Sequence, residues 1–98
     1  MSNAAPPLVL PSVVVLLPAA LVRLFPGAAR RVELSAATVG EAVAALEARW
    51  PGMRDRLCDS TPRVRRHINI FAAGRRATLA TPLPHGAEVI IMTAISGG

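Results

Sequence analysis

Residues 38–50 read TVGEAVAALEARW and hold the clearest local signal in the chain. Thr38 and Glu41 have the spacing of a capping box, in which the threonine hydroxyl binds the third helical N–H and the glutamate reaches back to the cap. Apolar residues then recur at steps of four, three and four, as an amphipathic helix requires: Val39, Val43, Leu46 and Trp50. A Pro-Gly pair follows at once. The pattern predicts a helix over residues 39–50 with this stripe in the core.

Strand patterns flank this helix on both sides. Upstream, residues 13–17 read VVVLL, a continuous apolar run typical of a strand buried on both faces. Residues 30–35 alternate polar and apolar, which is typical of a half-buried strand. Downstream, residues 67–71 alternate in the same way, and residues 89–92 read VIIM, a second continuous run. The sequence therefore predicts two central strands at opposite ends of the chain.

The connections are predicted from Gly, Pro and polar residues. Residues 18–29 contain a Pro-Gly pair and predict a long loop. Residues 53–66 predict a loop with a short helical turn. Residues 75–80 predict a short edge segment between turns at Gly74 and at residues 84–86.

The predicted order is strand, strand, helix, strand, short strand, strand. Pairing the two continuous apolar runs in parallel, with the single helix across one face, would bury both runs at once. We therefore expect an α+β fold: a single β-grasp (ubiquitin-like) domain with a mixed sheet and one main helix packed on one face. The domain is placed at residues 12–94, after a flexible leader at residues 1–11 and before a flexible diglycine tail at residues 95–98.

The composition limits the classes of function. The chain has 98 residues, 52% of them hydrophobic, which suffices for one core. Its formal charge is +5, yet all 11 basic residues are arginine, so no side-chain amine can accept an isopeptide bond. Cys58 is the only cysteine and cannot form an internal disulfide, and with His67 and His85 as the only histidines no zinc site is expected. We expect no metal, no bound cofactor and a reducing, cytoplasmic location.

The apolar stretch over residues 4–22 resembles a membrane segment in composition only. It contains four prolines, which oppose a continuous helix, and no Lys or Arg precedes it as in a signal peptide. Residues 1–4 look like a cloning remnant and are set aside. We therefore expect no association with a membrane.

Several segments together resemble those of a known family: residues 38–42, 67–71, 81–89 and 95–98. On these segments the chain resembles the MoaD/ThiS family of ubiquitin-like sulfur carriers, which includes the small subunit of molybdopterin synthase. Residues 53–59 and 66–70 are more similar to the members that serve cysteine synthesis. Two positions differ from the family pattern. Ala73-Gly74 stands where Asn or Asp is common, and Ile95-Ser96 precedes the diglycine where Val-Ala is common.

The resemblance implies that Gly98 is the working residue. A ubiquitin-activating-type adenylyltransferase would use ATP to adenylate the Gly98 carboxylate, and a sulfur donor would then replace AMP to leave a thiocarboxylate. A sulfur-accepting synthase would be the second partner. The chain would thus be a protein substrate and sulfur carrier, not an enzyme, although it could form the non-catalytic small subunit of a synthase. The receiving pathway stays open among molybdopterin, thiamine thiazole, cysteine and specialised thio-metabolites.

The last residues suit this chemistry. A C-terminal carboxylate has a pKa of about 3.3 to 3.7, so at neutral pH it is an anion that must be activated before a nucleophile can attack it. Gly97 and Gly98 have no Cβ, which lets the backbone enter a narrow channel and expose its carbonyl. Ile95 and Ser96 are expected to contact the partner.

Part of the folded domain must dock as well, because four terminal residues bury far less than the roughly 800 Å² per partner of a stable interface. Exposed apolar side chains on the open face of the sheet are the expected surface. Phe71 and Phe25 are the candidates, and burial of both in the core is the alternative.

Two other classes of function remain open. A ubiquitin-like modifier would share the activation step but join Gly98 to lysines of other proteins. A small basic interaction domain with an inert tail would use the arginines of residues 54–66, but no aromatic residue is interleaved there for stacking, so we expect no nucleic-acid partner. Cys58 has no activating partner at a recognisable spacing, and no catalytic set indicates an enzyme.

Overall fold

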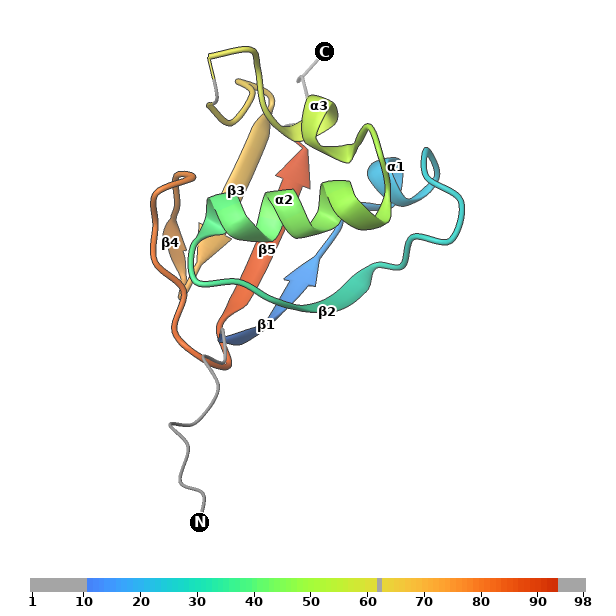
Figure 1. Cartoon of the computed structure of the whole chain (residues 1–98). Coiled ribbons are helices and arrows are strands. Elements are labelled where there is room, and N and C mark those ends of the chain that lie inside the picture. Colours follow the sequence, from blue (N-terminus) through green and yellow to red (C-terminus); the bar gives the residue numbers. More distant parts are fainter. Residues whose placement is uncertain (1–10, 62, 94–98) are drawn as a thin grey trace.

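The computed structural model describes residues 11–61 and 63–93, which form one five-stranded mixed sheet with helices on one face (Figure 1). The strands lie in the order β2-β1-β5-β3-β4. Their bounds are β1 Ser12–Leu16, β2 Arg31–Ser35, β3 Ile68–Ala72, β4 Arg75–Arg76 and β5 Glu88–Thr93. The helices are α1 Ala19–Val22, α2 Val39–Arg49 and α3 Met53–Leu57. None of the helices in these ranges is long and apolar enough to cross a membrane.

The two continuous apolar runs are neighbours in the sheet, as the sequence predicts. β1 and β5 pair in parallel, with Val15 opposite Val89 and Leu16 opposite Ile90. The other pairs are antiparallel: β1 with β2, β5 with β3, and β3 with β4. Parallel pairing of the first and last strands, with α2 crossing the sheet between them, is the β-grasp arrangement (Figure 1). The predicted fold class is therefore confirmed.

Helix α2 begins at the predicted cap and ends one residue before the predicted end. The backbone N–H of Glu41 donates to Thr38 Oγ1 at 3.1 Å, as a capping box requires. The return bond differs from the prediction, because Glu41 Oε1 accepts from the N–H of Ala37, one residue before the cap, at 2.8 Å. Trp50 is the C-cap and only half-buried, whereas Ala42, which the stripe omitted, is buried.

The connection between α2 and α3 is held by hydrogen bonds to the Glu47 carboxylate, a role that the sequence patterns did not predict. Glu47 accepts hydrogen bonds from the N–H groups of Gly52 at 3.1 Å and Arg54 at 2.9 Å. These two backbone bonds lower the pKa of Glu47 below its ordinary value. Because the folded state favours the ionised form, the bonds stabilise the fold above the ordinary glutamate pKa, and this contribution is lost as the pH falls through the lowered value.

The expectation that both apolar runs are buried on both faces is wrong. Along β1, Val13 and Val15 are buried while Val14 and Leu16 are half-buried. Along β5 the same alternation leaves Met92 50% exposed. The reason is that helices cover only one face of the sheet, so every second side chain of a central strand points to the uncovered face. This open face therefore carries apolar side chains.

Two connections contain helices. The segment predicted as a plain loop includes α1, a single turn in which the N–H groups of Leu21 and Val22 donate to the carbonyl of Pro18. Proline at a helix start needs no N–H partner, which makes Pro18 compatible with helix initiation and not only with a turn. The short helical turn predicted after residue 52 is α3. Of the edge segment predicted over residues 75–80, only β4 is a strand. Ala77, which follows β4, is buried.

The core beneath α2 is expected to tolerate truncation poorly. Leu46 is fully buried, so Leu46→Ala should lower the free energy of unfolding by about 2 to 5 kcal/mol. Leu24, which is 50% exposed, offers a control with the same chemical change, and Leu24→Ala should cost less than about 1 kcal/mol. Urea titration followed by Trp50 fluorescence measures both. Equal losses in the two variants would contradict the packing described here.

Candidate functional site

The predicted working residues follow directly on β5. Thr93 ends β5 and is the last residue that the structure describes, so Ile95, Ser96, Gly97 and Gly98 lie outside the described residues. Strand β5 lies in the middle of the sheet, hydrogen-bonded to β1 on one side and to β3 on the other. The last described residue, Thr93, therefore belongs to a strand that is paired on both sides.

An apolar row crosses the open face of the sheet. Leu16 of β1 is opposite Ile90 of β5, and Ile90 is opposite Phe71 of β3. All three side chains are half-buried, and the row ends in a charged residue on each side, Arg31 opposite Leu16 and Arg76 opposite Phe71. We call Leu16, Ile90 and Phe71 the open-face row. Neighbouring apolar pairs of this kind on an uncovered face are typical of a docking surface.

The row continues toward the end of β5. Met92, two residues beyond Ile90, points to the same face and is 50% exposed. An open groove of about 380 Å³ lies here, and its lining includes Leu16, Ile90, Met92 and Thr93. Apolar surface thus extends to the last described residue, where a partner that held the tail would meet it.

Phe71 and Phe25 occupy different places. Phe71 lies on the open-face row, on the face where it was predicted, although its side chain is half-buried rather than fully exposed. Phe25 is not on this face, so that part of the prediction is wrong. It follows α1 and packs against the core, and its ring would lie 3.4 Å from a Cβ added at Gly52. The Phe25 ring therefore lies on the helical side of the sheet, against the turn that leads into α3.

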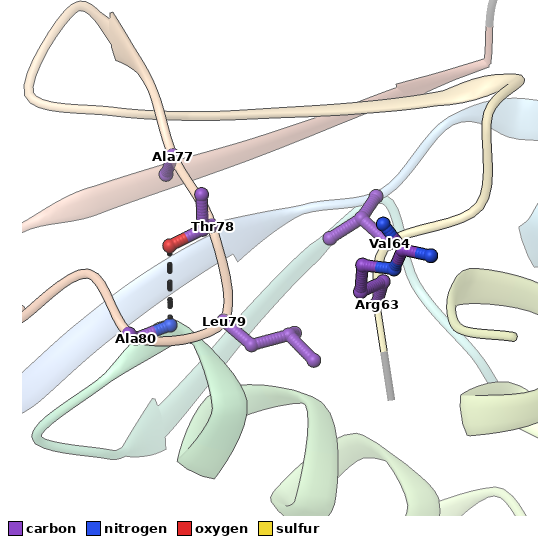
Figure 2. Close-up of a pocket in the computed structure, with 6 residues that line it drawn as sticks. All are labelled: Arg63, Val64, Ala77, Thr78, Leu79 and Ala80. Atoms are coloured by element: carbon purple, nitrogen blue, oxygen red, sulfur yellow. Dashed lines mark hydrogen bonds between the residues drawn. The ribbon is translucent and has the colours of Figure 1, made fainter. Parts of the chain in front are cut away.

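Figure 2 shows a second hollow, between residues 63–64 and residues 77–80. It measures about 420 Å³ and is lined mainly by apolar atoms, with Arg63 as its only charged residue. The Thr78 hydroxyl in it accepts from the N–H of Ala80 at 3.3 Å. These residues include no carboxylate, histidine or thiol, so no acid or base lies beside the Thr78 hydroxyl to activate it as a nucleophile.

Cys58 is buried and is the C-cap residue of α3. Burial away from water raises the pKa of the thiol, which the nearby Arg54 offsets only in part. A raised pKa keeps the group as a thiol, the form that is neither a good nucleophile nor a metal ligand. In the described part of the chain, no three His, Cys, Asp or Glu side chains gather as a metal site.

Cys58 is therefore expected to be dispensable for sulfur loading. Cys58→Ala should be loaded at close to the rate of the unsubstituted protein, because the buried thiol has no access to a reacting group. The assay is the rate of mass gain at a temperature where both proteins are folded. Near-complete loss in the folded variant would indicate a relay through the thiol.

The two histidines have different surroundings. His85 lies in the turn before β5, where its Nδ1 accepts from the N–H of Ser12 at 3.2 Å, so it helps to position the start of β1. His67 is exposed and immediately precedes β3. Its neighbour Ile68 is opposite Thr93, which puts His67 beside the end of β5.

Comparison with known proteins identifies the family. The sequence model of the ThiS family matches residues 15–98, which include all five strands except the start of β1 and also the terminal diglycine. The chain belongs to the ThiS family. Its members are small ubiquitin-like sulfur carriers rather than catalysts. No curated protein sequence matches the chain significantly.

Solved structures agree with this membership. The structure of SAMP1 from Haloferax volcanii is 29% identical over 89% of this chain and 99% of that one, with a TM-score of 0.75. A chain of the Amycolatopsis orientalis BexX/CysO complex is 28% identical over 88% and 99%, with a TM-score of 0.77. CysO from Mycobacterium tuberculosis is 29% identical over 85% and 99%, with a TM-score of 0.75. The ThiS-family chain is thus similar to both carrier and modifier proteins.

Proposed function

We propose that this ThiS-family chain carries sulfur as a thiocarboxylate on Gly98. The observation that supports this most is that the family match extends to residue 98 and so includes the terminal diglycine. Gly98 supplies the reacting carboxylate, and Gly97 supplies a second position without a side chain. The catalysts are the partners: a ubiquitin-activating-type adenylyltransferase that uses ATP and a synthase that receives the sulfur.

The chemistry takes two displacements. A carboxylate oxygen of Gly98 attacks the α-phosphorus of ATP, the bond to the leaving oxygen breaks, and pyrophosphate departs. This step converts an anion that resists attack into an acyl adenylate with a good leaving group. Hydrosulfide, or a donor that delivers sulfur at the same oxidation level, then attacks the Gly98 carbonyl carbon. The bond from this carbon to the AMP oxygen breaks, AMP departs, and the thiocarboxylate remains. This chain contributes the acyl group and its placement.

Placement requires the folded domain as well as the tail. The open-face row and Met92 offer apolar surface that reaches the end of β5, so a partner seated on this face would hold the following residues in line with its own site. Phe71 and Ile90 are the central contacts that we assign to this interface, and Ile95 and Ser96 are contacts of the tail. Phe25, on the helical side, is assigned to packing instead.

The adenylation step is tested by ATP–pyrophosphate exchange with the ubiquitin-activating-type enzyme from the same genome. The whole protein should support exchange that depends on its concentration. A free peptide of residues 93–98 should be a far poorer substrate, because it lacks the open-face row. No exchange with the whole protein would contradict the carrier function, and equal turnover of peptide and protein would contradict docking by the domain.

The receiving pathway that we favour is cysteine synthesis. Residues 53–59 and 66–70 resemble the carriers of that branch, and the similarity to CysO structures supports the same choice. Molybdopterin, thiamine thiazole and specialised thio-metabolites are the competing destinations. The genes that flank this one would discriminate among them, since a carrier and its synthase act on each other directly.

A second candidate function is protein modification through Gly98. It is favoured by the similarity to SAMP1, a small archaeal modifier protein. Conjugation shares the adenylation step and differs in the acceptor, which would be a lysine of another protein. Because the chain contains no lysine, its side chains could not extend such a conjugate into a branched polymer. An antibody against an N-terminal tag would reveal a ladder of conjugates in cells only if this function operates.

A further inference from the structure

The end of β5 lies beside an arginine-rich part of the surface. Thr93 is opposite Ile68, so the residues before β3 flank the point at which the chain leaves the sheet. Helix α3 lies at the same end of the domain as the tip of β5 (Figure 1). The segment that runs from α3 to the residue before β3 is basic, because residues 54–67 contain five arginines and two aspartates.

A groove lies between α3 and the residues before β3. It measures about 570 Å³. On one side it is lined by α3 and the residue before that helix (Gly52, Asp55, Arg56), and on the other side by residues that precede β3 (Arg65, His67). Arg65 is held in place, because its Nε donates to the carbonyl of Asp55 and its N–H donates to the carbonyl of Leu57. Arg66, next to it in the sequence, is exposed and lines an adjoining hollow with residues of β3 and β4, which Arg65 also lines. We call Arg56, Arg65 and Arg66 the basic rim.

The charge of the basic rim is largely uncompensated. Among the described residues the single ion pair is that of Arg31 with Glu33, and both residues lie on the edge strand β2 rather than in the rim. Of the two aspartates nearby, Asp59 accepts from the N–H and hydroxyl of Thr61 and from the N–H of Arg63, and these bonds lower its pKa. Asp55 is exposed and lies in the groove itself, where it offsets one of the three positive charges.

We propose that the basic rim is a second contact surface, which binds an acidic protein surface bordering the channel that receives the tail. The proposal rests on the proposed function, because it assigns the rim to the activating enzyme. Charges at the edge of an interface act mainly on the association rate, which they raise by steering the partner into register. Apolar contacts of the open-face row would hold the complex, and the rim would orient it.

A protein partner fits the rim better than a nucleic acid does. Proteins that bind single-stranded nucleic acid combine arginines with aromatic side chains on which bases stack, and residues 54–67 contain no aromatic residue. The rim is also adjacent to the exit of the tail, so any partner that holds the tail must cover or approach it. An acidic channel border meets both conditions.

The test compares charge reversals inside and outside the rim. Arg56→Glu and Arg66→Glu change exposed side chains, whereas Arg65 is avoided because it bonds to α3. Arg75→Glu makes the same change in charge on β4, opposite Ala72 and about 13 Å along β3 from Ile68. Each protein is adenylated by the activating enzyme of the exchange assay, at about 20 mM and about 0.5 M salt. The apparent kcat/KM and kcat are measured.

Each rim variant should lose about tenfold in kcat/KM at low salt, with kcat at saturation unchanged, and the loss should shrink at high salt. Arg75→Glu should lose less than about twofold. Equal losses for rim and control variants would overturn the proposal in favour of a net-charge effect. If the rim variants lost binding to a fluorescent single-stranded oligonucleotide but were adenylated normally, the proposal would be overturned in favour of a nucleic-acid surface. Failure of the unsubstituted protein to be adenylated would instead refute the proposed function.

Discussion

Deletion of Gly98 is expected to abolish sulfur loading, because it removes the carboxylate that the channel of the activating enzyme would hold at the reacting position. The new terminus, at Gly97, would end about one residue short, or roughly 3.5 Å, which places its carboxylate out of reach of the α-phosphorus. Addition of one alanine after Gly98 should have an equally large effect. Both variants are measured by mass spectrometry after incubation with the activating enzyme, ATP and a sulfur donor.

The matched control deletes residues from the other end. A protein that lacks residues 1–4 undergoes a similar truncation without any change at Gly98, and it should load sulfur like the full chain. All three proteins should unfold at the same denaturant concentration, since none of the changes touches residues 11–93. Sulfur gained by the protein without Gly98 would show that another group carries it.

A charge in the open-face row is expected to have the second largest effect. Ile90 lies between Leu16 and Phe71, and an interface over this row would remove it from water. Ile90→Asp would place an unpaired carboxylate there, and burial of such a group costs several kcal/mol. We expect kcat/KM for adenylation to fall by at least about a hundredfold, mainly through a higher KM.

Ser35→Asp is the control, because it adds the same charge on the same face at the outer strand β2, away from the row. It should change kcat/KM by less than about threefold. Phe71→Glu should behave like Ile90→Asp, since the two side chains are opposite each other. Normal kinetics for a folded Ile90→Asp protein would mean that partners do not use this face.

The elements that the sequence predicted well have local causes. The start of α2 depends on Thr38 and Glu41, which bond to backbone groups within four residues, so their spacing alone is informative. The central strands are rich in β-branched residues, and their position at the two ends of the chain leaves few ways to bury them other than side by side.

The features that sequence reasoning missed depend on tertiary context. A continuous apolar run is the same in a strand covered on both faces and in one whose second face binds a partner, so the exposure of Met92 could not be read from it. Phe25 was assigned to the wrong side because the fold of the loop after α1 decides where its ring lies. Glu47 contacts residues five and seven positions away, across a helix end, and no common motif has that pattern.

The candidate site likewise has a part that the sequence predicted and a part that only the structure shows. The terminal diglycine and the resemblance to the family could be recognised from the sequence alone, and the match to the family model extends over the diglycine. The open-face row was predictable only in part, through Phe71, because Leu16 and Ile90 join it through the register of three strands. The basic rim was visible as a cluster of arginines, but its position beside Thr93 follows from the pairing of β3 with β5.

The most direct test of the account is the mass of the C-terminal fragment after loading. The protein is incubated with the activating enzyme, ATP and a sulfur donor and then cleaved with trypsin, whose last site in this chain is Arg76, so residues 77–98 are released as one peptide. This peptide should gain the mass of one oxygen-to-sulfur exchange, and fragmentation should assign the gain to Gly98. An unchanged C-terminal peptide, or sulfur found instead on the peptide that contains Cys58, would contradict a thiocarboxylate on Gly98.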